Sequence, residues 1–297
     1  MTKSVREIQL PMFGLDTTKV VNVASVQHRS PFRYPGGKTW LVPFVQEWML
    51  SQPKRPVEFI EPFAGGAIIG LTVGFEKLAD HVTLVELDKQ VSAVWKTILE
   101  GDYQWLADQI LKFDLTSESV EVVLSQTDVS TEEKAFQILL KNRINRGGIL
   151  APGAGKIKHG ENGKGMKSRW YPETLAKRIL NIGKIRERIS FVEGDGLEVL
   201  QQNAHRSDAA FFIDPPYTAA GKKAGARLYT HFELDHEKLF SIVENLEGDF
   251  LMTYDNAPEI QTMTENHGFS TEPIAMKNTH HAEMSELLVG RDLGWII

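Results

Sequence analysis

The sequence predicts an α/β fold in which a mainly parallel sheet carries helices on both faces. Strand-sized apolar segments alternate with helix-sized segments near both ends of the chain. At about residues 100–188 this alternation stops, and basic, mostly helical segments take its place. We therefore expect one α/β domain, residues 1–99 plus 189–297, interrupted by a mostly helical insert at residues 100–188.

The first half of the sheet is expected before residue 100. Short apolar strands are predicted at residues 57–60 and 82–85. Each is followed by a helix with an apolar face, at residues 68–78 and 90–99. A further helix upstream would bury Leu41, Phe44, Val45 and Trp48 on one face.

The insert is expected to combine helices with one glycine-rich segment. Helices are predicted at residues 103–113, 132–143 and 172–188. Ser130, with Glu133 three residues later, has the spacing of a capping box, and Pro172 suits a first helical position. Residues 147–165 include seven glycines in nineteen positions, which makes them too flexible and polar to pack alone.

After the insert the alternation of strands and helices resumes. Most of the remaining segments are short apolar strands, two of them late in the chain. We expect strands at residues 189–192, 209–213, 250–253, 274–276 and 287–289, and helices at residues 197–202 and 236–246.

The composition excludes several classes of chemistry. The chain has no cysteine, so disulfides, cysteine-bound metals and a thiolate nucleophile are all ruled out. Methylation of cytosine C5 requires such a thiolate and is ruled out with it. No apolar run approaches the roughly 18 residues of a membrane span, and the start of the chain lacks the pattern of a secretory signal. We expect a cytoplasmic protein without a membrane partner.

Charge is distributed very unevenly along the chain. The formal net charge is −6, yet residues 141–188 hold thirteen basic and three acidic residues, a net charge of +10. The remainder of the chain is therefore at −16. Clustered cations suit phosphate contacts better than they suit an ordinary solvated surface, which mixes both signs. This window favours a nucleic-acid partner.

The strongest motif is Asp214-Pro215-Pro216-Tyr217, directly after the strand at residues 209–213. Ligands of open parallel sheets bind beyond the carboxyl ends of strands, where this motif stands. Two prolines make a rigid turn that presents a carboxylate, a carbonyl and an aromatic ring together. Such groups suit an amine on a flipped base: two oxygens accept its N–H hydrogens and the ring stacks. The alternative is a proline turn that ends the strand, with Tyr217 as a packing residue.

A glycine turn and two acids follow other predicted strands. Residues 61–67, Glu-Pro-Phe-Ala-Gly-Gly-Ala, join the first strand to its helix, where glycines let the backbone approach a ligand. The turn lacks the G-x-G-x-x-G spacing of dinucleotide sites. Glu86 ends the second strand and could accept ribose hydroxyls. Asp195 could accept a hydrogen bond from a nucleoside amine or only cap the next helix.

A second turn, Arg33-Tyr34-Pro35-Gly36-Gly37-Lys38, lies upstream of the first strand. It presents an aromatic ring and a lysine, which is a weak signal when taken alone. The nine histidines show no metal-ligand spacing, since His280 and His281 would face opposite ways in an extended chain. We expect no metal.

Together these motifs resemble the D12 class (group alpha, Dam-type) of DNA N6-adenine methyltransferases. The resemblance covers roughly residues 31–293, and the order of the motifs is its most specific feature: Pro-Gly-Gly-Lys turn, glycine turn, recognition region, Asp-Pro-Pro-Tyr. It implies a Rossmann-like methyltransferase sheet interrupted by a target-recognition domain. Departures from the class include Tyr34 at a tryptophan position, Ala67 at a glycine position and Glu86 at an aspartate position.

The resemblance also implies roles for individual residues. Asp214, Pro215 and Tyr217 would be catalytic, and Asp214 would also touch the cofactor, S-adenosylmethionine. The other residues of the cofactor site would be Tyr34, Lys38, Phe63, Ala64, Gly65, Gly66, Glu86 and Asp195. Double-stranded DNA would be bound by Lys141, Arg143, Asn145, Arg146, Lys156, Lys158, Lys164, Lys167 and Arg169. Among these, Arg143 and Asn145 are expected to contact base edges from the end of a helix, and the lysines to contact phosphates.

Three other functions remain open at this stage. The chain could methylate adenine N6 in RNA, or an amide of a protein glutamine, although those families usually have Asn in place of Asp214. It could also be a catalytically silent module that binds DNA and the cofactor. The oligomeric state and the target sequence do not follow from the residues.

Overall fold

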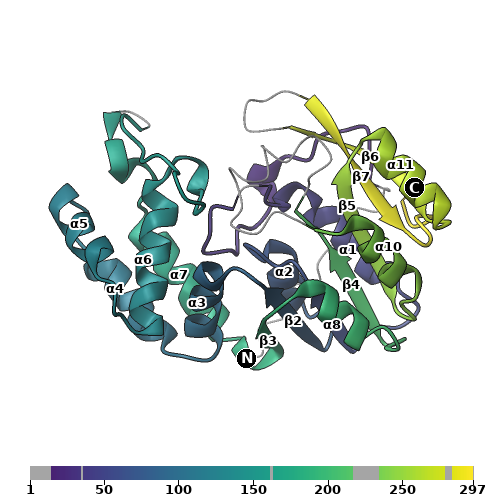
Figure 1. The fold of residues 1–297 in the computed structure, drawn as a ribbon, viewed down its shortest axis with the longest axis horizontal. Coiled ribbons are helices and arrows are strands. Elements are labelled where there is room, and N and C mark those ends of the chain that lie inside the picture. The colour runs from purple at the N-terminus through teal and green to yellow at the C-terminus, as the bar shows by residue number, and fades with distance from the viewer. Residues whose placement is uncertain (1–14, 35, 161–162, 217–233, 278–282, 297) are drawn as a thin grey trace, which may run out of the picture.

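A single twisted sheet forms the centre of the protein (Figure 1). The computed structural model describes residues 15–34, 36–160, 163–216, 234–277 and 283–296. Within these residues seven strands pair in the order β3-β2-β1-β4-β5-β7-β6. Their bounds are β1 Glu58–Glu61, β2 His81–Glu86, β3 Ile189–Glu193, β4 Ala209–Ile213, β5 Asp249–Asp255, β6 Ser270–Lys277 and β7 Glu283–Gly290.

The sheet is parallel except at one edge. Strands β1 to β5 all pair in parallel, whereas β7 runs antiparallel to both β5 and β6. The predicted α/β class with a mainly parallel sheet is therefore confirmed. The chain order reverses at β1, which pairs with β2 on one side and β4 on the other. At such a switch point the turns after the strands diverge and leave room for a ligand.

Helices cover both faces of the sheet. Alternation along β4 assigns the faces: Ala210 and Phe212 pack with α1, α2 and α3, while Phe211 and Ile213 pack with α8 and α10. The helices are α1 Val42–Ser51, α2 Ile68–Glu76, α3 Lys89–Leu99, α4 Tyr103–Lys112, α5 Ser117–Ser125, α6 Thr131–Ile144, α7 Pro172–Gly183, α8 Gly196–Gln202, α10 His236–Glu244 and α11 Pro258–Asn266.

Helices α4 to α7 lie together beyond α3, at one end of the molecule (Figure 1). Side chains of α4, α6 and α7 share the hydrophobic cluster of α3. The capping box at the start of α6 is present: Ser130 accepts from the amide of Glu133, and the Glu133 carboxylate accepts from the amide of Ser130. Whether this helical region is a separate domain, as the sequence predicts, stays a prediction.

One predicted helix was too long, and two helices were missed. The helix expected at residues 172–188 ends at Gly183, and a separate 3-10 turn, Arg186–Arg188, leads into β3. Gly183 lies against the ring of Tyr103, where a Cβ would come within 2.4 Å of a ring carbon. Glycine, a weak helix former, is thus required at the last turn. Helices α5 and α11 were not predicted.

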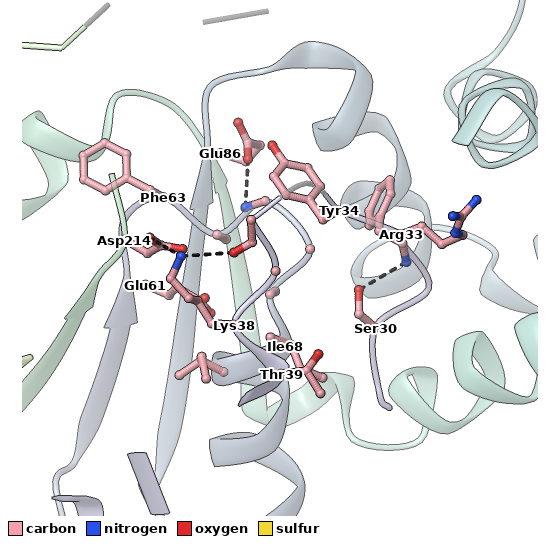
Figure 2. Close-up of a pocket in the computed structure, with 18 of the residues that line it drawn as sticks. Ser30, Arg33, Tyr34, Lys38, Thr39, Glu61, Phe63, Ile68, Glu86 and Asp214 are labelled. Atoms are coloured by element: carbon pink, nitrogen blue, oxygen red, sulfur yellow. Dashed lines mark hydrogen bonds and ion pairs between the residues drawn. The ribbon is translucent and has the colours of Figure 1, made fainter. Parts of the chain in front are cut away.

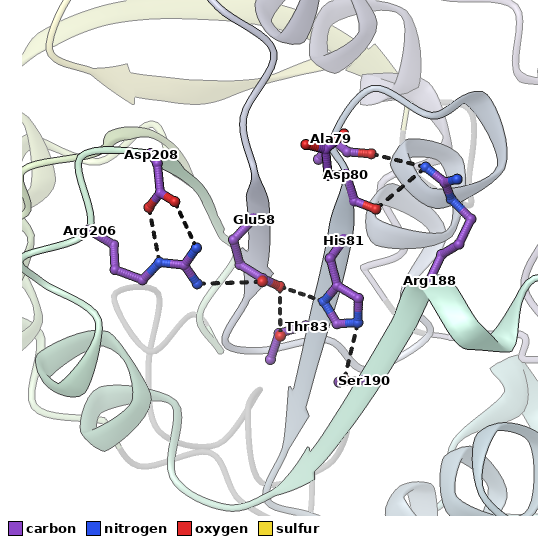
Figure 3. A network of polar contacts seen from close by, with 9 residues as sticks. All are labelled: Glu58, Ala79, Asp80, His81, Thr83, Arg188, Ser190, Arg206 and Asp208. Atoms are coloured by element: carbon purple, nitrogen blue, oxygen red, sulfur yellow. Dashed lines mark hydrogen bonds and ion pairs between the residues drawn. The ribbon is translucent and has the colours of Figure 1, made fainter.

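A polar network ties together the amino ends of the first strands (Figure 3). The Glu58 carboxylate accepts from Thr83 Oγ1 at 2.8 Å and contacts His81 Nδ1 at 2.9 Å. Arg206 bridges Glu58, at 3.4 Å, and Asp208, at 3.0 Å. At this end of the sheet the carboxylates are thus matched by cations and neutral donors.

Candidate active site

A cavity of about 770 Å³ opens beyond the carboxyl ends of β1, β2, β3 and β4 (Figure 2). It is formed by the turns after these strands, the segment around Tyr34 and Lys38, and residues of the helical region. The predicted residues that line it are Tyr34, Lys38, Phe63, Ala64, Gly65, Gly66, Glu86, Asp195, Asp214 and Pro215. The structure therefore brings the predicted cofactor residues into one place. Tyr217 lies outside the described residues.

The glycine turn after β1 is shaped by an aromatic ring. Gly65 adopts a φ of 48°, and Ala67, which precedes α2, adopts a φ of 49°. A Cβ on Gly65 would lie 2.6 Å from Cε1 of Tyr34, so only glycine permits this contact. Trp95 Nε1 donates to the carbonyl of Gly65 at 2.9 Å and holds the turn in place. The glycines thus admit Tyr34 as well as any ligand.

Glu86 links the end of β2 to the glycine turn. Its Oε2 accepts from the amide of Gly65 at 2.9 Å, and Oε1 accepts from the amide of Asp88 at 2.8 Å. Burial raises the pKa of Glu86 to about 7. Asp88, rather than Glu86, caps α3, because its side chain accepts from Gln90 at 2.8 Å. Glu86 therefore does not cap α3, and it lines the cavity instead.

The structure shows one of the two roles considered for Asp195. Its carboxylate accepts from the amide of Leu197 at 2.7 Å and caps α8. The same residue lines the cavity. Contact with a nucleoside amine stays a prediction.

Asp214 is held between Lys38 and β5. Its Oδ1 accepts from Thr253 Oγ1 at 2.8 Å and pairs with Lys38 Nζ at 3.1 Å (Figure 2). Lys38 is only 3% exposed, and its Nζ also donates to Gly36 O at 3.1 Å and pairs with Glu286 at 3.4 Å. The proline turn thus presents a carboxylate whose position is fixed from two sides.

Several acids around Asp214 were not identified as site residues from the sequence. Burial raises the pKa of Glu61 well above its usual value, and nearby Asp214 and Glu86 add to the effect. Burial also raises the pKa of Asp255, and that of Glu286 to about 7, with the Lys38 ammonium opposing both shifts. Glu61 and Asp255 end parallel strands, which could have marked them. Glu286 lies on the antiparallel strand β7, and no motif pointed to it.

The predicted DNA-binding residues fall into two groups. Lys156, Lys158, Lys164, Lys167 and Arg146 are exposed. Residues 155–157 are not loose, because Ile157 N donates to Ile144 O at 2.8 Å and Arg146 N to Gly155 O at 2.9 Å. Lys141 is half-buried, and Arg169 lines the cavity.

The second group, Arg143 and Asn145, is buried, whereas side chains that contact base edges are normally exposed. Arg143 is 5% exposed and its guanidinium donates to the carbonyl of Pro31. Asn145 is 9% exposed and donates to Ile149 O at 2.8 Å. Both side chains donate to backbone carbonyls inside the protein, and Arg143 also lines the cavity. Contact of either residue with a base edge stays a prediction.

The described residues contain neither a metal-binding cluster nor a membrane-spanning helix. No group of three or more histidine, aspartate or glutamate side chains there is arranged to hold a metal ion. None of the helices in those residues has the length and apolar character needed to cross a membrane.

Comparison with known proteins gives structural likeness only. No family model and no curated protein matches the chain. A proposed RNA methyltransferase from Pyrococcus horikoshii has 11% identity and a TM-score of 0.41 over 90% of this chain and 92% of its own. A proposed methylase from Haemophilus influenzae has 13% identity and a TM-score of 0.31 over 86% and 85%. The precorrin-6y C5,15-methyltransferase of Geobacter metallireducens has 10% identity and a TM-score of 0.33 over 84% and 86%. At such TM-scores these structures identify neither the reaction nor the substrate of this chain.

Proposed function

We propose that the protein is an S-adenosylmethionine-dependent methyltransferase that methylates the N6 amine of adenine in DNA. The proposal rests on one observation. Asp214 and Pro215 lie in the same cavity as the glycine turn and Glu86. A nucleoside cofactor and a planar amine need separate recognition groups. Here those groups stand at the ends of neighbouring parallel strands, β1, β2 and β4.

The residues of the cavity fit a nucleoside cofactor. Its volume of about 770 Å³ is within the range of small-molecule sites, about 300–1,000 Å³. A carboxylate offers about four acceptor positions, so Glu86 can accept ribose hydroxyls in addition to its two backbone amides. The ring of Tyr34 and the side chain of Phe63 offer apolar surfaces beside the glycine turn (Figure 2). When bound there, the cofactor would supply an electrophilic methyl group.

Asp214 and Pro215 would act on the amine. The lone pair of an adenine amine is delocalised into the ring, so the nitrogen is a poor nucleophile. The Asp214 carboxylate and the Pro215 carbonyl would accept its two N–H hydrogens and favour a tetrahedral nitrogen. The amine nitrogen would take the methyl group that the cofactor supplies, and Asp214 would accept the proton that the nitrogen then loses. Tyr217 would stack on the flipped base.

Lys38 and Thr253 would hold Asp214 in place for this reaction. The pair at 3.1 Å with Lys38 and the hydrogen bond at 2.8 Å from Thr253 restrict the carboxylate. Lys38 also contributes a positive charge amid Asp214, Asp255 and Glu286. A carboxylate fixed before the substrate arrives requires little reorganisation during the reaction.

DNA is proposed as the substrate because of the basic segment beside the cavity. Residues 141–188 have a net charge of +10, and Arg143, Gly147, Arg169 and Arg178 of this segment line the cavity. Exposed lysines of the same segment would contact the phosphates of a duplex. The class that the motif order resembles acts on DNA, which supports the same substrate.

One experiment tests the reaction and the substrate together. Radiolabelled methyl transfer is measured from S-adenosylmethionine to duplex DNA, to RNA and to mixed protein, with Asp214→Ala as the inactive control. We expect label in DNA, located on adenine N6 after digestion to nucleosides. Label in RNA or protein instead would contradict the substrate. Absence of label with intact cofactor binding would indicate a silent binding module.

A further inference from the structure

A cluster of three arginines and one histidine lines the cavity away from Asp214. Arg143 comes from α6, Arg178 from α7, and Arg33 and His28 from the segment before α1. Figure 2 shows Arg33 and Asp214 on opposite sides of Tyr34. The cavity therefore has an acidic end, around Asp214, and a basic end, which no part of the proposed reaction uses.

The basic end is held rigidly by its own backbone contacts. The side-chain amide of Asn142 accepts from the Arg33 amide at 2.8 Å and donates to the Arg33 carbonyl at 2.8 Å. Arg143 donates to Pro31 O, and Arg178 donates to Ser30 O at 3.1 Å. Helices α6 and α7 thus both donate hydrogen bonds to residues 30–33, and this brings Arg143 and Arg178 together.

The charges of two members of this cluster, Arg143 and Arg178, are poorly compensated. In the part of the chain that the structure describes, no carboxylate pairs with Arg143 or Arg178. Arg143 Nε is buried and has no hydrogen-bond partner there, although the side chain is only 5% exposed. Burial, with Arg178 and Arg33 nearby, lowers the pKa of Arg143 to about 9. A buried donor without an acceptor is costly, and an anion beside Arg143 and Arg178 would offset the two positive charges that lie together there.

We propose that Arg143 and Arg178 form a binding site for a phosphate group of the bound DNA strand, next to the nucleotide whose base reaches Asp214. The planar guanidinium fork matches the oxygens of a phosphate. A base that is turned out of a duplex takes its flanking phosphates with it toward the pocket. The site assigns Arg143 to the backbone of the target nucleotide, not to a base edge. Only the source of the phosphate rests on the proposed function.

His28 provides a direct readout of an anion at this site. Partial burial lowers the pKa of His28, and the charges of Arg178 and Arg143 add to the effect. A bound anion offsets those charges, so it should raise the pKa of His28. The resonance is followed by NMR across pH, assigned with His28→Gln, in chloride and then in inorganic phosphate at equal ionic strength. A short mixed-sequence duplex is the second probe.

Variants of α7 separate the site from general charge effects. Arg178→Ala should abolish the response of His28 to both probes, and should weaken duplex binding roughly 10- to 100-fold, as expected for a lost charge-assisted hydrogen bond. Lys177→Ala is the matched control, because Lys177 is the exposed neighbour on the same helix and does not line the cavity. It should leave the response intact. Arg178→Lys keeps the charge without the fork and covers the case in which the alanine variant does not fold.

The possible outcomes decide between sources of the phosphate. A response to both probes that is lost in Arg178→Ala supports the proposal. A response to inorganic phosphate alone would assign the site to a free phosphate group and overturn the DNA strand as its ligand. No response to either probe, or an equal loss in Lys177→Ala, would overturn the site itself. None of these readouts requires methyl transfer, so failure of the proposed reaction is detected separately.

Discussion

The pKa values of carboxylates are shifted in opposite directions at the two ends of the sheet. At the amino ends of the strands, Arg206 pairs with Asp208 and Glu58, and its hydrogen bonds hold the pKa of Asp208 below its usual value (Figure 3). At the carboxyl ends, burial raises the pKa of Glu86 and of Glu286 to about 7. One end therefore favours ionised acids, and the other disfavours them.

The difference follows from what each end must do. At the amino ends, Glu58 meets donors from β2 and from the turn before β4, so its charge is satisfied within the protein. Acids at the carboxyl ends stand around a cavity and share Lys38 among Asp214, Asp255 and Glu286. Buried acids beside a cavity can exchange contacts with a ligand, and shifted pKa values accordingly concentrate at functional sites.

The largest expected difference between the two ends concerns catalysis. Asp214→Ala should lower the rate of methyl transfer by about two to three orders of magnitude, because an electrostatic contact to the reacting amine is lost. Asp208→Ala, at the other end, should leave the rate close to that of the unchanged protein. Rates are measured under single-turnover conditions, with circular dichroism to verify folding. Near-normal turnover by Asp214→Ala would remove this residue from the mechanism.

DNA should meet only the carboxyl-end face of the protein. Replacing Lys156, Lys158, Lys164 and Lys167 together with alanine should reduce the slope of log affinity against log salt by about 3 to 4, since each phosphate contact contributes about 0.9. The methylated sequence should not change, because phosphate contacts carry no sequence information. Fluorescence anisotropy at several salt concentrations and sequencing of methylated sites measure both.

The matched control for this variant lies at the amino ends of the strands. Lys54 and Arg55, just before β1, are also exposed and basic. The Lys54→Ala/Arg55→Ala double variant should keep the full salt slope. If both variants flattened the slope equally, DNA would be attracted by general charge rather than by the segment beside the cavity.

Stability should depend on pH with opposite signs at the two ends. Glu286 has a folded pKa of about 7 against a usual 4.5, so the folded state holds more protons between these values and stability falls as pH rises through that window. Glu286→Gln should reduce this fall by on the order of 2 kcal/mol. Asp208→Asn should instead remove a stabilisation that is present above the usual carboxyl pKa and lost as pH falls. Urea unfolding from about pH 3 to pH 8 tests both signs, because the Asp208 effect lies below its usual carboxyl pKa and the Glu286 effect lies above it.

Elements with strong local patterns could be predicted from the sequence. The central strand β4, Ala209–Ile213, is a continuous apolar run, because both of its faces are buried by helices. The turn after it could be placed for the same reason. Helix α11, by contrast, buries only Ile260 and Thr264, so its apolar periodicity is too weak to detect. The pairing of β7 between β5 and β6 depends on contacts that are distant in the chain.

Part of the site could be predicted because it follows the ends of parallel strands, while Tyr34 and Lys38 were predicted from the family resemblance. Asp214, Glu86 and the glycine turn obey that rule, and the structure places them in one cavity. Glu286 and Thr253 do not follow it, because their positions depend on the register of β5 with β7. The burial of Arg143 was missed for a similar reason: its partner, Pro31, lies 112 residues away.

The smallest expected effect is a shift of cofactor affinity with pH. Ionised Glu86 accepts hydroxyl hydrogens better than its protonated form does, and its pKa of about 7 means that ionisation rises about tenfold between pH 6 and pH 8. Affinity for S-adenosylmethionine should rise by up to that factor, and binding should release a fraction of a proton near pH 7. Calorimetry in buffers with different ionisation enthalpies measures both quantities. Glu86→Gln should bind more weakly and without this pH dependence, whereas Glu58→Gln, at the opposite end of the sheet, should match the unchanged protein. An unaltered pH profile in Glu86→Gln would mean that another group titrates. Glu86 would then hold Gly65 in place through its hydrogen bond and would not contact the cofactor.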